Sequence, residues 1–225
     1  MSISHQQVEK DILKYDRLLA WSPRSDPDRP SLLYRVAALR RDRFKRSHQK
    51  GDLDKSIAHL TETILIASQP SPDVVHAFYA LASSLISRFP LSRQPEDVRS
   101  SLQYLRFLRI NFHPLEAFGI RHGEPTSGLI FGLAQNLVLG SGEMMRDMEE
   151  MVALIPEFLA SDAPTHLQMW TFSAFAEAVN KTDIFRRKHT QQVTDRIITI
   201  LREATVLNPD SHVSFALASC LSARF

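Results

Sequence analysis

The stretch that decides the fold is Tyr34-x-x-Ala37…Arg43-Phe44…Asp52-Leu53-x-x-Ser56-Ile57-x-x-Leu60, because it returns 45 residues later without a gap as Tyr79-x-x-Ala82…Arg88-Phe89…Asp97-Val98-x-x-Ser101-Leu102-x-x-Leu105. Residues 215–225 repeat the front half again, since Phe215-Ala-Leu-Ala-Ser-Cys-Leu-Ser-Ala-Arg-Phe225 aligns with residues 79–89. A fixed period of this length is typical of stacked, near-identical supersecondary units. The repeat therefore predicts the architecture and leaves the function open.

Apolar residues recur at helical spacing almost throughout the chain. In 53–68, for example, Leu53, Ile57 and Leu60 fall on one helix face. No stretch shows sustained apolar–polar alternation, so no strand is predicted. The predicted helices are 5–20, 30–47, 53–68, 72–88, 95–111, 125–139, 143–160, 164–181, 189–207 and 210–225.

Prolines and acids mark the ends of these helices. Four prolines are expected near helix starts, where the missing N–H does no harm: Pro30, Pro72, Pro125 and Pro164. Four are expected in the breaks: Pro70, Pro90, Pro114 and Pro209. Pro156 lies inside the helix predicted at 143–160 and should kink or split it. Acids are expected as N-caps or in first turns at Asp52, Asp54, Glu96 and Asp97.

The predicted fold is all-α: one domain over 1–225, built as a right-handed superhelical stack of antiparallel helical hairpins with a concave groove. It divides into a half unit at 1–21, units at about 22–70, 71–114, 115–162 and 163–208, and a partial unit at 209–225. The period cannot be followed through 112–142, where most glycines collect. Irregular stretches of repeat proteins are often loops on the binding face.

Composition places the chain among globular proteins, with 44% hydrophobic residues and a net charge of +2. The charge is uneven: the first 50 residues carry 12 Lys/Arg against 6 Asp/Glu, and the remainder carries 15 against 19. One cysteine, Cys220, and an N-terminus without an apolar signal region favour the cytoplasm, with the nucleus left open. The uncharged stretch at 125–142 is too short in its apolar part to span a bilayer.

The segment Leu33…Ala38-Leu39…Arg43-Phe44…Gly51-Asp52-Leu53-Asp54-Lys55-Ser56-Ile57, preceded by 22–31, resembles one repeat of the large fungal family of tetratricopeptide-like arrays. Members of that family often carry a caspase-like CHAT domain after the repeats, and this chain contains none. The resemblance extends over about 20–110 and 209–225. The period of 45 exceeds the roughly 34 residues of the common unit, so the helices or turns are longer. Alanine (Ala37, Ala82, Ala218) replaces glycine where the paired helices approach.

The resemblance implies a partner-binding surface along the first helix of each hairpin. Carried to the matching positions, it gives Tyr34, Ala38, Arg41, His76, Tyr79, Ser83, Ile86, His212, Phe215, Ser219 and Ser222. The narrower set of partner-binding candidates is Tyr34, Arg41, His76, Tyr79, Ser83, Ile86, His212 and Phe215. Tyr34, Tyr79 and Phe215 equally suit a core between hairpins.

Other candidate sites favour structural interpretations. The basic run Arg35, Arg40, Arg41, Arg43, Lys45, Arg46, His48 and Lys50 is spread around a helix, which favours a solvated face over a nucleic-acid site. His113, Glu116, His122 and Glu124 flank a glycine break and suit polar loops better than a metal site. Met144, Met145, Met148 and Met151 favour core filling over an adaptable partner surface. Cys220 takes the repeat position of Ser84 and suits packing.

These patterns predict a non-catalytic scaffold that binds a peptide or protein partner, without cofactor or metal and without a membrane. One alternative is the regulatory repeat segment of a larger caspase-like enzyme. A weaker alternative is nucleic-acid binding through the basic N-terminal quarter. The helix predicted at 210–225 has the sequence of a first helix with no second helix after it, which predicts either a truncated product or self-association through its apolar side.

Overall fold

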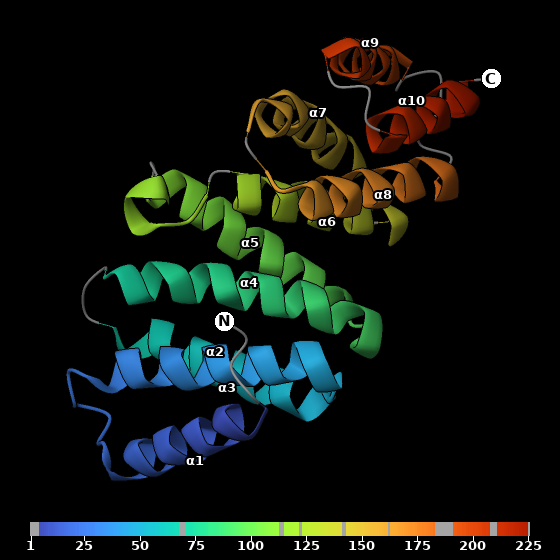
Figure 1. The fold of residues 1–225 in the computed structure, drawn as a ribbon. Coiled ribbons are helices and arrows are strands. Elements are labelled where there is room, and N and C mark those ends of the chain that lie inside the picture. Colours follow the sequence, from blue (N-terminus) through green and yellow to red (C-terminus); the bar gives the residue numbers. More distant parts are fainter. Residues whose placement is uncertain are drawn as a thin grey trace. The chain divides into compact units, whose positions relative to one another are not determined.

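The computed structural model describes residues 5–67, 71–112, 115–121, 123–140, 143–161, 163–182, 191–207 and 211–224, and within these ranges the fold is helical, with no strand (Figure 1). The predicted all-α class is confirmed. The helices are α1 His5–Trp21, α2 Arg29–Ser47, α3 Lys50–Ile66, α4 Pro72–Ser92, α5 Pro95–Asn111, α6 Gly123–Val138, α7 Met144–Ala160, α8 Thr165–Lys181, α9 Gln191–Leu207 and α10 Ser211–Arg224, with a 3-10 turn, η1, at Leu115–Phe118.

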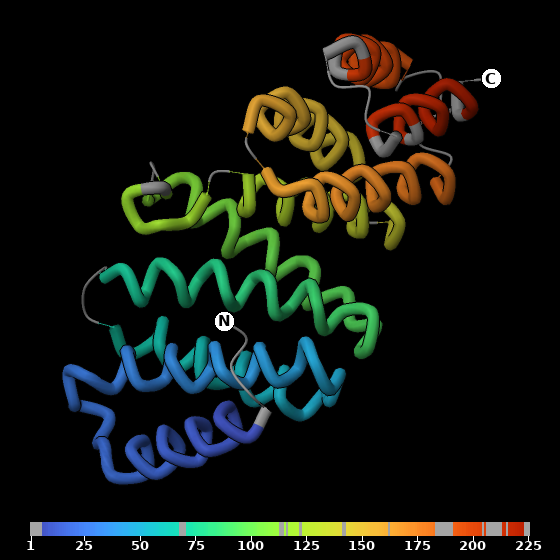
Figure 2. The backbone as a smooth tube through the Cα atoms, in the orientation of Figure 1, coloured from blue at the N-terminus to red at the C-terminus, as the bar shows by residue number. Residues whose placement is uncertain are grey.

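The helices form two compact units, unit 1 at 1–118 and unit 2 at 119–225. In unit 1, α2 packs against α3 and α4 packs against α5 (Figure 2). These pairs coincide with the hairpins predicted at 22–70 and 71–114. The hairpins are joined where α4 packs on α3 and, less extensively, on α2, while α1 packs on α2. The single domain predicted over 1–225 stays a prediction.

The core of unit 1 comes from the repeat positions themselves. Leu53, Leu60 and Leu81 are at most 1% exposed, and they share one cluster with Ala37 and Ala77. A second cluster joins α1 to α2; its buried members are Val8, Ile12, Leu19, Leu33 and Val36. The small alanines let the paired helices approach closely, so the leucines of the facing helix fill the space between them.

The packing of unit 2 agrees with the hairpin predicted at 115–162, because α6 packs against α7, and differs from the one predicted at 163–208. Helix α6 packs against α7 and α8, while α10 packs against α8 and α9. The predicted unit at 163–208 pairs α8 with α9, yet the close neighbours of α8 among the described helices are α6 and α10. Two direct contacts hold α8 on α6: the Ser127 and Thr171 hydroxyls lie 2.7 Å apart, and the Phe131 ring stacks on Trp170 at 3.9 Å between centroids.

One expectation about proline is wrong, and a second is wrong as far as it predicts a split helix rather than a kinked one. Pro90, expected in a break, lies inside α4, which runs on to Ser92. Pro156 does not split α7, which continues to Ala160. Each proline removes one backbone hydrogen bond, the one to the carbonyl four residues earlier, and the residues after it keep the helical conformation. Pro30, Pro72, Pro125 and Pro164 lie at helix starts as predicted. Pro70, Pro114 and Pro209 lie outside the described residues.

One described helix, α4, is long and apolar enough to cross a membrane by length and composition. Its most apolar window is 56% buried inside the structure, and α4 packs on α3 and α5. The core helix of a soluble protein has the same length and composition, so this helix is weak evidence for a membrane span.

Candidate binding site on helices α2 and α4

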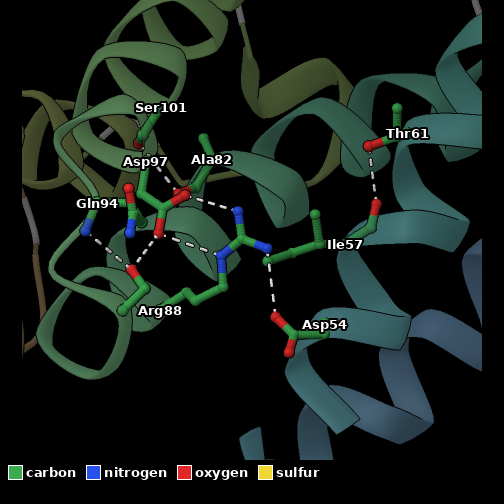
Figure 3. Close-up of polar contacts among 9 residues, drawn as sticks. Asp54, Ile57, Thr61, Ala82, Arg88, Gln94, Asp97 and Ser101 are labelled. Carbon is green, nitrogen blue, oxygen red and sulfur yellow. Dashed lines mark hydrogen bonds and ion pairs between the residues drawn. The ribbon is translucent and has the colours of Figure 1, made fainter. Parts of the chain in front are cut away.

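The turn between the two helices of each hairpin in unit 1 is closed by the same arginine–aspartate pair. Arg43 binds Asp52 through both nitrogens of one guanidinium edge, with Nε 2.8 Å from Oδ2. Arg88 binds Asp97 in the same way, at 3.1 Å from Nε and 2.6 Å from Nη2 (Figure 3). Both carboxylates are nearly fully buried, at 4% and 3% exposed. Asp52, Glu96 and Asp97 therefore lie in first turns as predicted, whereas Asp54 lies beyond the first turn of α3. Asp52 and Asp97 also pair across the hairpin.

Backbone geometry repeats with the same offset. His48 and Arg93 end α2 and α4 with positive φ angles of 54° and 55°, and their N–H groups donate to Phe44 and Phe89. This left-handed cap closes a helix end by satisfying a carbonyl of its last turn. The same turn contains a further match that was not predicted from the sequence: the Gln49 and Gln94 N–H groups donate to the Ser47 and Ser92 hydroxyls. The 45-residue shift would have found it.

A buried serine ties the two helices of each hairpin together. The Ser56 hydroxyl donates to the Ala37 carbonyl and the Ser101 hydroxyl to the Ala82 carbonyl, both at 3.0 Å. Ser56, Ser101, Ala37 and Ala82 are all 0% exposed. The serine lies opposite an alanine because the small alanine side chain lets the two helices pack closely enough for the hydroxyl to reach the carbonyl. In unit 2 the buried Asp147 is bound instead by Asn136, at 2.6 Å.

The structure brings four of the predicted partner-binding residues together where α2 and α4 pack. Tyr34 and Arg41 lie two turns apart on α2, and His76 and Tyr79 lie one turn apart on α4. The Tyr34 and His76 rings are 6.0 Å apart between centroids. All four side chains are half-buried. They lie between the two hairpins and are partly exposed. Tyr34 and Tyr79 therefore belong in part to the core between the hairpins and in part to the surface.

Arg41 differs from the arginines around it. Arg29, Arg40, Arg43 and Arg88 each contact a carboxylate. Within the described part of the chain, Arg41 makes no hydrogen bond or ion pair, although burial lowers its pKa and Tyr79 and Tyr34 oppose that shift. Burial also raises the pKa of Tyr34, an effect that Arg41 opposes. Arg41 is therefore a poorly solvated cation beside two phenols.

Of the remaining predicted partner-binding residues, Ser83 extends this group and Ile86 does not. Ser83 is half-buried, and its hydroxyl donates to the Tyr79 carbonyl one turn back at 2.9 Å. Ile86 is 4% exposed, so its side chain belongs to the core. The side chains of His212 and Phe215 lie outside the described residues, although both positions are in α10. We therefore restrict the candidate site to Tyr34, Arg41, His76, Tyr79 and Ser83.

The basic run on α2 is largely paired inside unit 1. Arg40 lies 2.6 Å from Asp16 and is 5% exposed, and Arg43 is bound to Asp52. Arg35 interacts with Tyr15, which raises the pKa of its guanidinium. Because phosphate contacts need several free cations on one face, this pairing weakens the nucleic-acid alternative.

The other candidate residues have structural surroundings where they are described. Met148 and Met151 are 0% exposed, which confirms the predicted core filling at these two positions, whereas Met144 and Met145 are half-buried. Cys220 is 0% exposed, and burial raises the pKa of its thiol to about 12, so it stays protonated at neutral pH as a packing residue. Glu124 pairs with Arg121 at 2.7 Å. His113, His122 and the side chain of Glu116 lie outside the described residues, which contain no group of three or more metal ligands.

Helix α10 buries Val213, Ala216 and Cys220 against α8 and α9. Ala218, which aligns with the fully buried Ala37 and Ala82, is exposed. In unit 1 these alanines are covered by the second helix of their hairpin, and no described helix takes that place on α10. Self-association through α10 stays a prediction.

Comparison with protein-family models, with curated proteins and with solved structures finds no match to this chain. The candidate site therefore depends on the geometry of α2 and α4.

Proposed function

We propose that the chain is a non-catalytic scaffold, a tetratricopeptide-like right-handed superhelix that binds a peptide segment of a protein partner. The segment lies along the first helices of successive hairpins, across Tyr34 and Arg41 of α2 and His76, Tyr79 and Ser83 of α4. The single observation that carries the proposal is Arg41, a poorly solvated guanidinium without an ion-pair partner among the described residues.

A cation in this position costs stability, because burial removes water, and Asp42, the neighbouring carboxylate, opposes this effect without forming an ion pair with Arg41 among the described residues. An incoming anion regains that free energy, and guanidinium groups bind carboxylates through two parallel hydrogen bonds. The Tyr34 and Tyr79 rings beside Arg41 offer apolar contact at low conformational cost. The favoured ligand is therefore a peptide with a carboxylate next to an apolar residue. The buried thiol of the one cysteine suits a reducing compartment, and we place the scaffold in the cytoplasm.

The test begins with Arg41→Met, which keeps the apolar stem of the side chain and removes its charge. Peptides are first selected from a random displayed library on the wild-type chain. We expect the selected peptides to carry a carboxylate and to bind Arg41→Met at least about tenfold more weakly, roughly 1.4 kcal/mol. The matched control is Arg99→Gln, which removes a cation that is 55% exposed on α5 and should leave binding unchanged.

Stability provides a second readout that a structural role would not give. If Arg41 serves binding, Arg41→Met should unfold at the same urea concentration as the wild type or a higher one. A clear loss of stability would assign Arg41 to the fold. Failure to select any peptide, or equal binding to both forms, would refute the proposed site.

A further inference from the structure

Helix α1 has one face that unit 1 covers and one that it leaves open. Val8, Ile12 and Leu19 are at most 8% exposed and pack against Leu33 and Val36 of α2. On the opposite side, Leu13, Leu18 and Trp21 are 58%, 43% and 88% exposed. Three large apolar side chains in water on one helix are unfavourable unless another surface covers them.

The open face has the shape that receives another helix. At 3.6 residues per turn, side chains four apart form ridges. Lys10, Lys14 and Leu18 form one ridge, and Leu13, Arg17 and Trp21 form the next. These six residues line a shallow groove of about 480 Å³. A ridge of side chains from a second helix fits between two such rows, which is the commonest way helices pack in globular proteins.

The charge on this face is mainly positive. In the described part of the chain, none of Lys10, Lys14 and Arg17 is in an ion pair, although Lys14 Nζ lies 5.9 Å from the centre of the Tyr15 ring. Two carboxylates of α1 have partners of their own: Asp16 binds the buried Arg40, and Asp11, at the edge of this face three residues before Lys14, accepts a hydrogen bond from Gln7 at 2.8 Å. The groove therefore combines apolar contacts with three cations that form no ion pair among the described residues.

We propose that the outer face of α1 docks an acidic amphipathic helix of a protein partner. Around the helix the order is Leu13, Arg17, Lys10, Trp21, Lys14, Leu18, so cations occupy the middle of the face and the leucines flank it. A helix that lies in a membrane has the reverse order, with apolar residues central and lysines at the margins. Carboxylates on the ridge of the docked helix meet Lys10, Lys14 and Arg17, while its apolar residues cover Leu13, Leu18 and Trp21.

The probe is a synthetic 18-residue amphipathic helix with glutamates at every fourth position beside a leucine face, and its matched form has each glutamate replaced by lysine. Binding to the full chain is followed by anisotropy of the labelled peptide. It is also followed by Trp21 emission in a Trp170→Phe background, because the chain has two tryptophans. We expect the acidic peptide to bind at least about tenfold more tightly than the lysine form, and Trp21 emission to shift to the blue.

Reversing the charge of the groove tests whether these residues make the contact. The variant K10E/K14E/R17E should lose the acidic peptide by at least about tenfold and gain the lysine peptide, an exchange that misfolding cannot produce. The matched control is K45E/K50E/R202E, which changes the net charge equally at three other exposed positions and should behave as wild type.

Three outcomes would overturn the proposal. Equal or absent binding of the two peptides shows that the groove does not recognise acidic helices. Stronger binding to phosphatidylserine vesicles, lost in K10E/K14E/R17E, assigns the face to a lipid surface. Dimerisation in light scattering that the same variant abolishes assigns it to a second copy of the chain. Because α1 and Arg41 occupy different surfaces of unit 1, Arg41→Met should bind the acidic peptide normally, so the two proposals fail separately.

Discussion

The pairing of Arg88 with Asp97 should be a main determinant of the stability of unit 1. Asp97 is 3% exposed; Arg88 gives it two hydrogen bonds, and the Ser92 hydroxyl gives a third at 2.7 Å. Arg88→Ala leaves this buried carboxylate with the serine alone. Removing one partner of a buried ion pair costs about 3–5 kcal/mol. Since Arg88 is itself 25% exposed, water enters the vacated space, and we expect a loss of about 2–4 kcal/mol.

The equivalent change in the first hairpin should cost less. Asp52 is bound by Arg43, but Arg40 also lies 3.8 Å from it and is 5% exposed. After Arg43→Ala a buried cation therefore remains close to the carboxylate. We expect a loss of about 1–2 kcal/mol, smaller than for Arg88→Ala despite the matching sequence. Arg88 also bonds Asp54 of the preceding hairpin, at 3.3 Å, which adds to the difference (Figure 3).

Urea unfolding followed by circular dichroism measures both losses, and hydrogen exchange of peptides from 72–111 assigns the transition to unit 1. The double variant Arg88→Ala with Asp97→Ala isolates the pair, because it removes the charge that each single variant leaves buried. We expect it to cost at least about 1 kcal/mol less than the sum of the two single changes. Additive losses, or a cost for Arg43→Ala equal to that for Arg88→Ala, would refute this reasoning.

Three further predictions test other parts of the fold. Ser56→Ala and Ser101→Ala should each lower stability by the same amount, about 1 kcal/mol in urea unfolding, because each removes one buried 3.0 Å hydrogen bond to a carbonyl. Unequal losses would contradict the equivalence of the two hairpins. Gly123→Ala should cost about 1–3 kcal/mol by thermal unfolding, because its Cβ would lie 2.8 Å from the Ala163 Cβ. The matched variant Gly51→Ala meets nothing within 4 Å and should be neutral or stabilising. Similar melting temperatures for the two variants would show that the residues around 123 and 163 move apart at little cost. Burial and Arg40 lower the pKa of His59 from 6.5, so protonation of His59 favours the unfolded state, and stability should be complete above about pH 6.5 and fall as the pH drops below that value. His59→Gln should flatten this part of a profile of urea midpoint against pH. An unchanged profile would exclude His59 as the source of the pH dependence.

Unit 1 can be predicted in detail from the sequence because its two hairpins use the same residues for the same contacts. Positions shared at the 45-residue offset are those that both hairpins need: the arginine–aspartate pair, the buried serine and the alanine that receives it. Each identity has a contact behind it, so the comparison separates structural residues from variable ones without any alignment. Pro90 lies outside this comparison because the first copy has Lys45 there, so the shared positions do not indicate that α4 continues through the proline to Ser92.

Unit 2 is less predictable because its contacts have no second copy in the sequence. Ser127 and Thr171 join α6 to α8 through hydroxyls 44 positions apart, which no local spacing indicates. In α7 the buried Asp147 is bound by Asn136, where each hairpin of unit 1 uses an arginine. Because the partner is an amide and not a guanidinium, the sequence does not show that the two contacts are equivalent. The helices could be read from their apolar spacing, whereas their neighbours depend on such single contacts.

The candidate site shows why charge counting alone misleads. Arg40, Arg41 and Arg43 lie within four residues of one helix, and the sequence presents them as one basic face. Helical phase separates them: Arg40 turns to Asp16 of α1, Arg43 turns to Asp52 of α3, and Arg41 turns toward α4 beside Tyr79. Folding uses the first two, because each is matched by a carboxylate. The third has no such match in the described structure, so the charge that contributes least to folding is the one we propose for binding.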